Sequence, residues 1–71
     1  MPLAMVETGR RVCILAVEAG HGLRGRLAAM GLVPGVEIEV VRNSFNGPFI
    51  IALKGSRLIL GRGMAYKIMV A

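Results

Sequence analysis

Short apolar runs separated by glycine, proline and asparagine dominate the chain. Runs of about four to eight residues rich in Val, Ile and Leu are typical of β-strands. The first run, within residues 11–18, is apolar over consecutive positions, which favours a strand buried on both faces. The second, residues 36–40, alternates, which predicts one buried face and one face carrying Glu37 and Glu39. In all, the pattern predicts five strands, at residues 11–18, 36–40, 49–53, 57–60 and 67–70.

The spacing of apolar positions changes between the first two strands. Leu23, Leu27 and Met30 follow one another at i, i+4 and i+7, which predicts a short helix that packs on the strands through this face. Arg24 and Arg26 then point away from it. Such a short helix is not stable alone, so tertiary packing must hold it.

A sharp reversal is predicted directly after the helix. Gly31 stands where a helix C-terminus favours a left-handed residue, and Leu32 can pack back over the last turn. Residues 33–36 place Pro34 and Gly35 at the two central positions of a type II turn. A tight connection at residues 54–56 and a single helical turn within residues 61–65 complete the expected connections.

Composition limits the class of protein. The chain has 71 residues, a formal net charge of +5, 55% hydrophobic and 4% aromatic residues, and one Cys. This excludes a disordered chain and an internal disulfide. The longest stretch without Asp, Glu, Lys or Arg, residues 43–53, is too short to span a membrane, and the first residues lack the pattern of a signal peptide. We therefore expect one all-β domain over residues 1–71, a small closed or half-closed five-stranded barrel with one inserted helix, located in the cytoplasm.

Catalysis is not expected. His21 is the only histidine, Cys13 lies in an apolar strand where a thiol is usually a small buried hydrophobe, and Glu37 with Glu39 is typical of a solvated strand face. A transition-metal site needs three or four convergent ligands, which this chain does not offer by itself. Weak Fe²⁺ binding through His21 and Cys13, or a site shared between chains, stays open.

Two binding functions remain. A nucleic-acid-binding barrel would use basic side chains interleaved with aromatic ones, but the chain has only Phe45, Phe49 and Tyr66. A protein partner is favoured because Phe45 stands at the expected tip of the loop at residues 43–48, where so small a domain can hardly bury it. Arg24 and Arg26 also flank a thin apolar helix face.

The segment from Arg26 to Gly35, RLAAMGLVPG, resembles the signature of the FeoA family of small bacterial proteins. Its structural positions here are Leu27, Met30, Gly31, Pro34 and Gly35. The resemblance extends over nearly the whole chain, with Gly47 and Pro48 before a strand and Gly55 in a hairpin. It departs from the family at residues 60–65, LGRGMA, where many members carry Leu-Arg followed by acidic residues and an Ala.

The resemblance implies an SH3-like barrel and a non-enzymatic role in ferrous iron uptake. It further implies docking on the cytoplasmic part of a GTPase-containing, FeoB-type iron permease, with no nucleic acid expected as a partner. On this hypothesis the partner-contact candidates are Arg24, Arg26, Phe45 and Arg62. The alternative is a small basic nucleic-acid-binding barrel.

Overall fold

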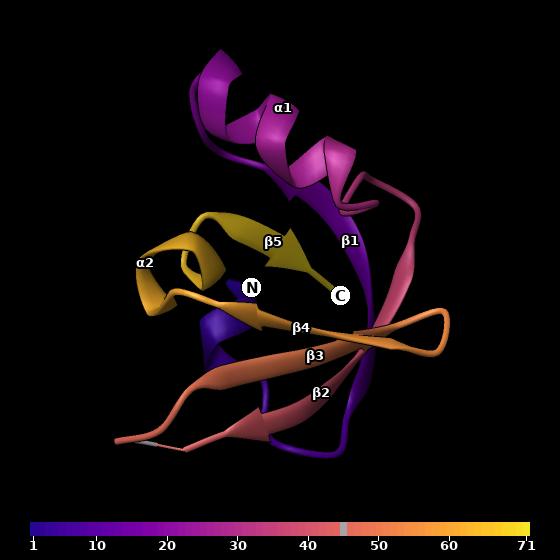
Figure 1. Cartoon of the computed structure of the whole chain (residues 1–71), viewed down its shortest axis with the longest axis vertical. Coiled ribbons are helices and arrows are strands. Elements are labelled where there is room, and N and C mark those ends of the chain that lie inside the picture. Colours follow the sequence, from indigo (N-terminus) through magenta and orange to yellow (C-terminus); the bar gives the residue numbers. More distant parts are fainter. Residues whose placement is uncertain (45) are drawn as a thin grey trace.

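Five antiparallel strands form the body of the molecule, paired in the order fourth, third, second, first and fifth along the chain. The helix that follows the first strand in the sequence stands at one end of them (Figure 1). The computed structural model describes residues 1–44 and 46–71. Within them the predicted five-stranded barrel with one inserted helix is confirmed. The elements are η1 (Leu3–Met5), β1 (Arg11–Val17), α1 (His21–Ala29), β2 (Glu37–Asn43), β3 (Phe49–Leu53), β4 (Ser56–Leu60), α2 (Arg62–Ala65) and β5 (Ile68–Val70).

One apolar core fills the inside of the sheet, and the described residues bury no polar or charged side chain in it. Phe49 is its largest fully buried side chain. Leu3, Ala4 and Val6 also belong to it. The hydrophobic pattern assigned no element to this N-terminal segment, because so few residues show no period.

The prediction that the first strand is buried on both faces is wrong. Leu15 is 55% exposed and Ala16 is exposed as well. The pairing of β1 with β5 shifts register between Ile14 and Ala16, so the alternation of buried and exposed residues breaks there. The described chain forms a single curved layer around its core, so the outer face of β1 has no second layer to cover it.

The helix begins two residues before the predicted apolar stretch, and its buried face is narrower than expected. Leu27 is fully buried and Leu23 is partly buried against the core, but Met30 is 37% exposed. Met30 is the C-cap, and the chain changes direction immediately after it. Leu32 packs into the core in its place.

The helix end has the predicted left-handed residue. Gly31 has φ +89°, and its N–H donates to the Ala28 carbonyl at 2.9 Å while the Leu32 N–H donates to the Leu27 carbonyl at 2.9 Å. These two bonds are the Schellman pattern, which satisfies carbonyls that the helix end would leave free. The prediction of a glycine stop with Leu32 folded back is confirmed.

The type II turn is confirmed too, and it anchors the chain on β1. Gly35 has φ +93°, and the Val36 N–H donates to the Val33 carbonyl at 3.2 Å. The Gly35 N–H donates to the Ile14 carbonyl at 2.8 Å, and the Ile14 N–H donates to the Val36 carbonyl at 2.9 Å. The turn therefore sets the point at which β2 starts to pair with β1.

The later strands follow the pattern closely. β2 buries Ile38 and Val40 as the alternation predicts, and it continues to Asn43 past a register shift against β3. β3 and β4 form a regular hairpin whose two turn residues, Lys54 and Gly55, have φ +50° and +81°. Two consecutive positive φ angles are the type I′ turn that suits a two-residue hairpin.

Substitution of Gly31 by Ala tests the reversal. A Cβ there would lie 3.0 Å from Leu53 Cδ2, on a backbone conformation that L-residues rarely adopt. We expect Gly31→Ala to lower the free energy of unfolding by about 1–3 kcal/mol in urea denaturation. Gly25→Ala is the matched control, because a Cβ at this helical position meets nothing within 4 Å, and we expect it to raise stability by up to about 1 kcal/mol. Equal effects of the two substitutions would contradict this account.

Candidate partner-docking surface

Two open grooves flank α1. The first, the α1–β4 groove, has a volume of about 380 Å³ and is lined by Ala29, Met30, Gly31, Leu53, Lys54, Ser56 and Leu58. The second, the α1–turn groove, has a volume of about 330 Å³ and is lined by Val17, His21, Arg24, Gly25, Ala28, Leu32, Val33 and Pro34. Both exist because the helix rests on the barrel mainly through Leu27, so its two sides stay uncovered.

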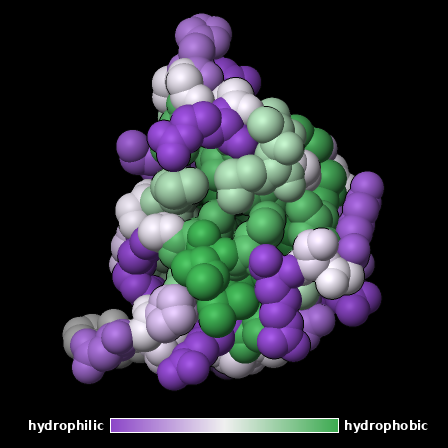
Figure 2. Space-filling model, in the orientation of Figure 1, coloured by the Kyte–Doolittle hydropathy of each residue, from purple (hydrophilic) through white to green (hydrophobic). Residues whose placement is uncertain are grey.

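The α1–β4 groove combines apolar walls with a cationic rim. Met30 and the half-buried Leu58 provide the apolar surface, and the exposed Lys54 lies at the edge. In the view of Figure 2, apolar side chains gather below α1, over the region of β4 and β5. Exposed apolar surface bordered by charged side chains is typical of a protein-binding site.

The α1–turn groove contains one of the predicted contact residues. Arg24 lines it together with the exposed Val33, whereas Arg26 is exposed on α1 and lines neither groove. The predicted orientation of the two arginines away from the core is therefore confirmed. Phe45, predicted as a loop-tip contact, lies outside the described residues.

Arg62, another predicted contact residue, binds within the chain. Its Nη1 donates to Asn43 Oδ1 at 2.9 Å, its Nη2 donates to the Ser44 carbonyl at 2.6 Å, and its guanidinium carbon lies 5.7 Å from the centre of the Phe49 ring. This distance is within cation–π range. Among the described residues, no hydrogen bond, ion pair or groove joins Arg62 to Arg24 or Arg26. The structure therefore does not bring the three described contact residues, Arg24, Arg26 and Arg62, into one patch.

Asn43 is a key residue that the sequence reasoning missed. Its Nδ2 donates to the carbonyls of Ala4 at 3.0 Å and Val6 at 2.7 Å, and its own N–H donates to Thr8 Oγ1 at 2.8 Å. With the Arg62 bond, one side chain ties the N-terminal segment, the end of β2 and the start of α2 together. The only local signal was an asparagine at the end of a strand, which ordinarily indicates a turn.

The family-like signature residues form the walls of the two grooves. Met30 and Gly31 line the α1–β4 groove, Pro34 lines the α1–turn groove, and Leu27 fixes α1 on the core between them. Gly35 provides the turn that returns the chain to β1. The signature thus specifies the shape of this surface.

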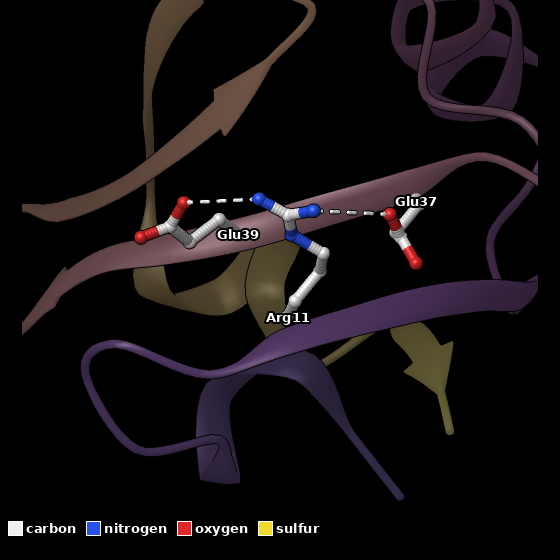
Figure 3. Close-up of polar contacts among 3 residues, drawn as sticks. All are labelled: Arg11, Glu37 and Glu39. Atoms are coloured by element: carbon white, nitrogen blue, oxygen red, sulfur yellow. Dashed lines mark ion pairs between the residues drawn. The ribbon is translucent and has the colours of Figure 1, made fainter.

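A third and larger depression, of about 730 Å³, lies on the sheet over β1, β2 and the end of the β3–β4 hairpin that carries its turn. Arg11 lies between two carboxylates there, with its guanidinium nitrogens 3.6 Å from Glu37 and 3.9 Å from Glu39 (Figure 3). The prediction that the two carboxylates form a solvated face is confirmed. Exposed ion pairs of this kind contribute about 0–1 kcal/mol, so the arrangement neutralises the carboxylates more than it stabilises the fold.

The described residues hold no group of three or more His, Cys, Asp or Glu side chains that could bind a metal ion. Cys13 is half-buried on β1, less covered than predicted, and its thiol lies 3.6 Å from the Ile14 carbonyl. His21 is exposed at the first position of α1. Within the described ranges, no helix is long and apolar enough to cross a membrane.

Substitution of Asn43 by Ala is expected to lower the free energy of unfolding by about 2–4 kcal/mol, because it leaves two backbone carbonyls and the Nη1 group of Arg62 without a partner. Urea denaturation measures this loss. Arg11→Ala, which removes two exposed ion pairs, is the control, and its effect should stay within about 1 kcal/mol. A double-mutant cycle of Asn43→Ala with Arg62→Ala should show coupling, and strict additivity would contradict the described network.

Comparisons with known proteins identify the relatives of this chain. The family model for the FeoA domain matches residues 1–71. The chain is 46% identical over 69 residues, 97% of its length and 83% of the relative's, to a Methanocaldococcus jannaschii protein named "Putative Fe(2+) transport protein A". A crystal structure of a protein described as the iron uptake regulatory protein FeoA superposes with a TM-score of 0.91 at 36% identity, covering 99% of this chain and 93% of that one.

A fold likeness also extends to the FeoA of Stenotrophomonas maltophilia, described as a prokaryotic SH3 domain protein. Its TM-score is 0.85 at 22% identity, covering 100% of this chain and 89% of that one. The barrel is therefore SH3-like, as the resemblance implied. Because the family model covers every residue from 1 to 71, and the Gly31 and Gly35 reversal has the predicted conformation, this chain belongs to the FeoA family.

Proposed function

We propose that this chain is a non-enzymatic accessory protein of ferrous iron uptake. It acts in the cytoplasm, docks on the cytoplasmic part of a GTPase-containing iron permease and modulates transport. The observation that carries the docking is the uncovered apolar surface beside α1, with Met30 and Leu58 inside the α1–β4 groove and Lys54 at its rim.

Membership in the FeoA family supports the link to iron. The relative that is 46% identical is named for Fe(2+) transport, and the crystal structure that is 36% identical is described as an iron uptake regulatory protein. Both matches cover nearly the whole of this chain, so the support for this role is not confined to one segment of it.

The chemistry of the described residues supports a binding role. Cys13 is half-buried, His21 is exposed on another element, and the carboxylates of Glu37 and Glu39 face Arg11. None of these groups forms a nucleophile–base pair in the hydrogen bonds of the structure. Binding energy is therefore the means by which such a domain could influence its partner.

Modulation requires that the domain bind two states of the permease with different affinity. A groove with apolar walls is suited to this, because a partner side chain that fills it in one state and withdraws in another changes the buried apolar area. Burial of one apolar side chain is worth about 1.5–3 kcal/mol, which is a factor of about ten to a hundred in an equilibrium. One partner side chain buried in this groove would thus suffice to shift the equilibrium between two permease states of similar free energy.

The nucleic-acid alternative gains no support from the aromatic residues. Single-strand binding barrels stack bases on successive exposed aromatic rings. Here Phe49 is buried beneath Arg62, and Tyr66 is the one exposed aromatic residue among those described. The docking proposal therefore fits the described surface better.

Substitution of Met30 by Glu tests the docking surface. A carboxylate in the apolar groove must be desolvated against its partner, so we expect association with the isolated cytoplasmic region of the permease to weaken at least about tenfold. Isothermal titration calorimetry, with and without guanine nucleotide, measures the change. Met30 is exposed enough at the C-cap for the variant to fold, which circular dichroism checks.

Met5→Glu is the matched control. Met5 is a methionine that is 59% exposed on η1 and lines neither groove, so its substitution should leave the affinity within about twofold. Absence of association between the unmodified chain and the cytoplasmic region, with and without nucleotide, would refute the proposed function. An equal loss in both variants would refute the groove as the contact.

A further inference from the structure

The described residues cover one edge of the sheet and leave the other edge free. At the β5 edge, the Met1 ammonium donates to the Val70 carbonyl at 3.0 Å, the Val70 N–H donates to the Met1 carbonyl at 2.8 Å, and Pro2 bridges to Met69. At the β4 edge, β3 is the only strand that pairs, and no described residue outside this hairpin makes a backbone hydrogen bond to β4. The backbone of β5 is therefore paired on its outer side, whereas that of β4 is not.

The register of the hairpin identifies the free backbone groups. Leu53 and Ser56 pair directly beside the two-residue turn, so they exchange both ladder hydrogen bonds, and the pairs along an antiparallel ladder then alternate. The pairs Ala52–Arg57 and Ile50–Ile59 are consequently the non-bonded ones. The N–H and C=O groups of Arg57 and Ile59 thus point away from β3, where another strand could bind them.

This edge lacks most of the features that prevent strand pairing. Proteins block free edges with proline, bulges, charged residues or a covering element. β4 contains no proline, pairs with β3 without a register shift, and carries Ile59, the most exposed large hydrophobic residue described, at 70%. Arg57 is its one charged residue. A regular, uncovered strand of this kind is suited to strand addition.

The side chains around β4 indicate the chemistry of the added strand. On the outer face of β4, Arg57 provides positive charge beside the exposed Ile59. Lys54 in the adjoining turn, which also borders the α1–β4 groove, adds a second cation in a chain whose net charge is +5. On the inner face, Leu58 and Met30 line the α1–β4 groove. Successive residues of an added strand alternate between these faces, so its outward residues suit carboxylates and its inward residues suit apolar side chains.

We propose that the free edge of β4 binds an extended partner segment by strand addition, and that this segment alternates acidic and apolar residues. A second copy of this chain fits less well, because it would bring two chains of charge +5 together. The recognition mode rests on the geometry of β4, and only the identity of the partner rests on the proposed function.

Amide hydrogen exchange followed by NMR tests the proposal. The probe is a capped eight-residue peptide of alternating glutamate and valine, and a lysine–valine peptide is its charge-reversed counterpart. At a concentration that occupies about nine-tenths of the protein, the acidic peptide should slow exchange of the Arg57 and Ile59 amides about tenfold. The Leu58 amide, already bonded to β3, should change little. The lysine peptide should have no effect.

Variants separate the backbone and charge contributions. Ile59→Pro removes an outward N–H that makes no hydrogen bond in the hairpin, so it should weaken peptide binding at least about fivefold. An acidic peptide with N-methylated amides should show the same loss of affinity for the unmodified protein. Arg57→Glu should reverse the preference between the two peptides. Arg10→Glu, a charge reversal at an exposed position outside β4, should not.

Three results of the peptide experiment would overturn the proposal. They are no protection by the acidic peptide, equal protection by both peptides, and protection that increases with protein concentration in the absence of peptide, which would indicate a dimer through β4. Association with the permease region without protection of the Arg57 and Ile59 amides would also overturn it while leaving the proposed function intact. Protection by the acidic peptide without permease association would support strand addition at β4 and refute the proposed function.

Discussion

The chain reversal between α1 and β2 is the constraint on which the rest of the molecule depends. Two glycines with positive φ, Gly31 and Gly35, let the chain stop a helix and return to β1 within six residues. The hydrogen bonds of Ile14 with the turn then set where β2 pairs with β1. Since β3 and β4 are added in turn to β2, their position relative to β1 depends on this point.

The molecule closes by polar contacts rather than by covalent bonds. Asn43 and Arg62 join the N-terminal segment to the end of β2 and the start of α2, over a core that contains no buried polar side chain among the described residues. A domain of this size buries only about 60% of its unfolded surface. A few hydrogen bonds can therefore make up a large share of its small free energy of unfolding. The free thiol of Cys13 takes no part in this closure.

The uncovered features of the surface lie together around α1 and β4. The helix contacts the core mainly through Leu27, which leaves a groove on each side of it. The α1–β4 groove runs beside a strand whose outer edge is unpaired, so side-chain burial and backbone pairing are offered at neighbouring places. An accessory domain that must bind without catalysing could combine affinity from the first with directional specificity from the second.

The sequence by itself determined the features that depend on neighbouring residues. The helix stop at Gly31, the type II turn at Gly35, the buried face of β2 and the hairpin at Lys54 and Gly55 were all predictable, because positive φ and strand alternation are short-range properties. The resemblance of the signature to the FeoA family was readable for the same reason, since its residues are contiguous.

Only the tertiary structure decided which surfaces are covered. The exposure of Leu15, the burial of the N-terminal segment beneath Asn43, and the free edge of β4 depend on strand order and on contacts between residues far apart in the chain. Local periodicity cannot encode these contacts, because the same apolar run is buried or exposed according to what packs against it. The same reason explains why Arg62, predicted as a partner contact, is found bound to Asn43 within the chain.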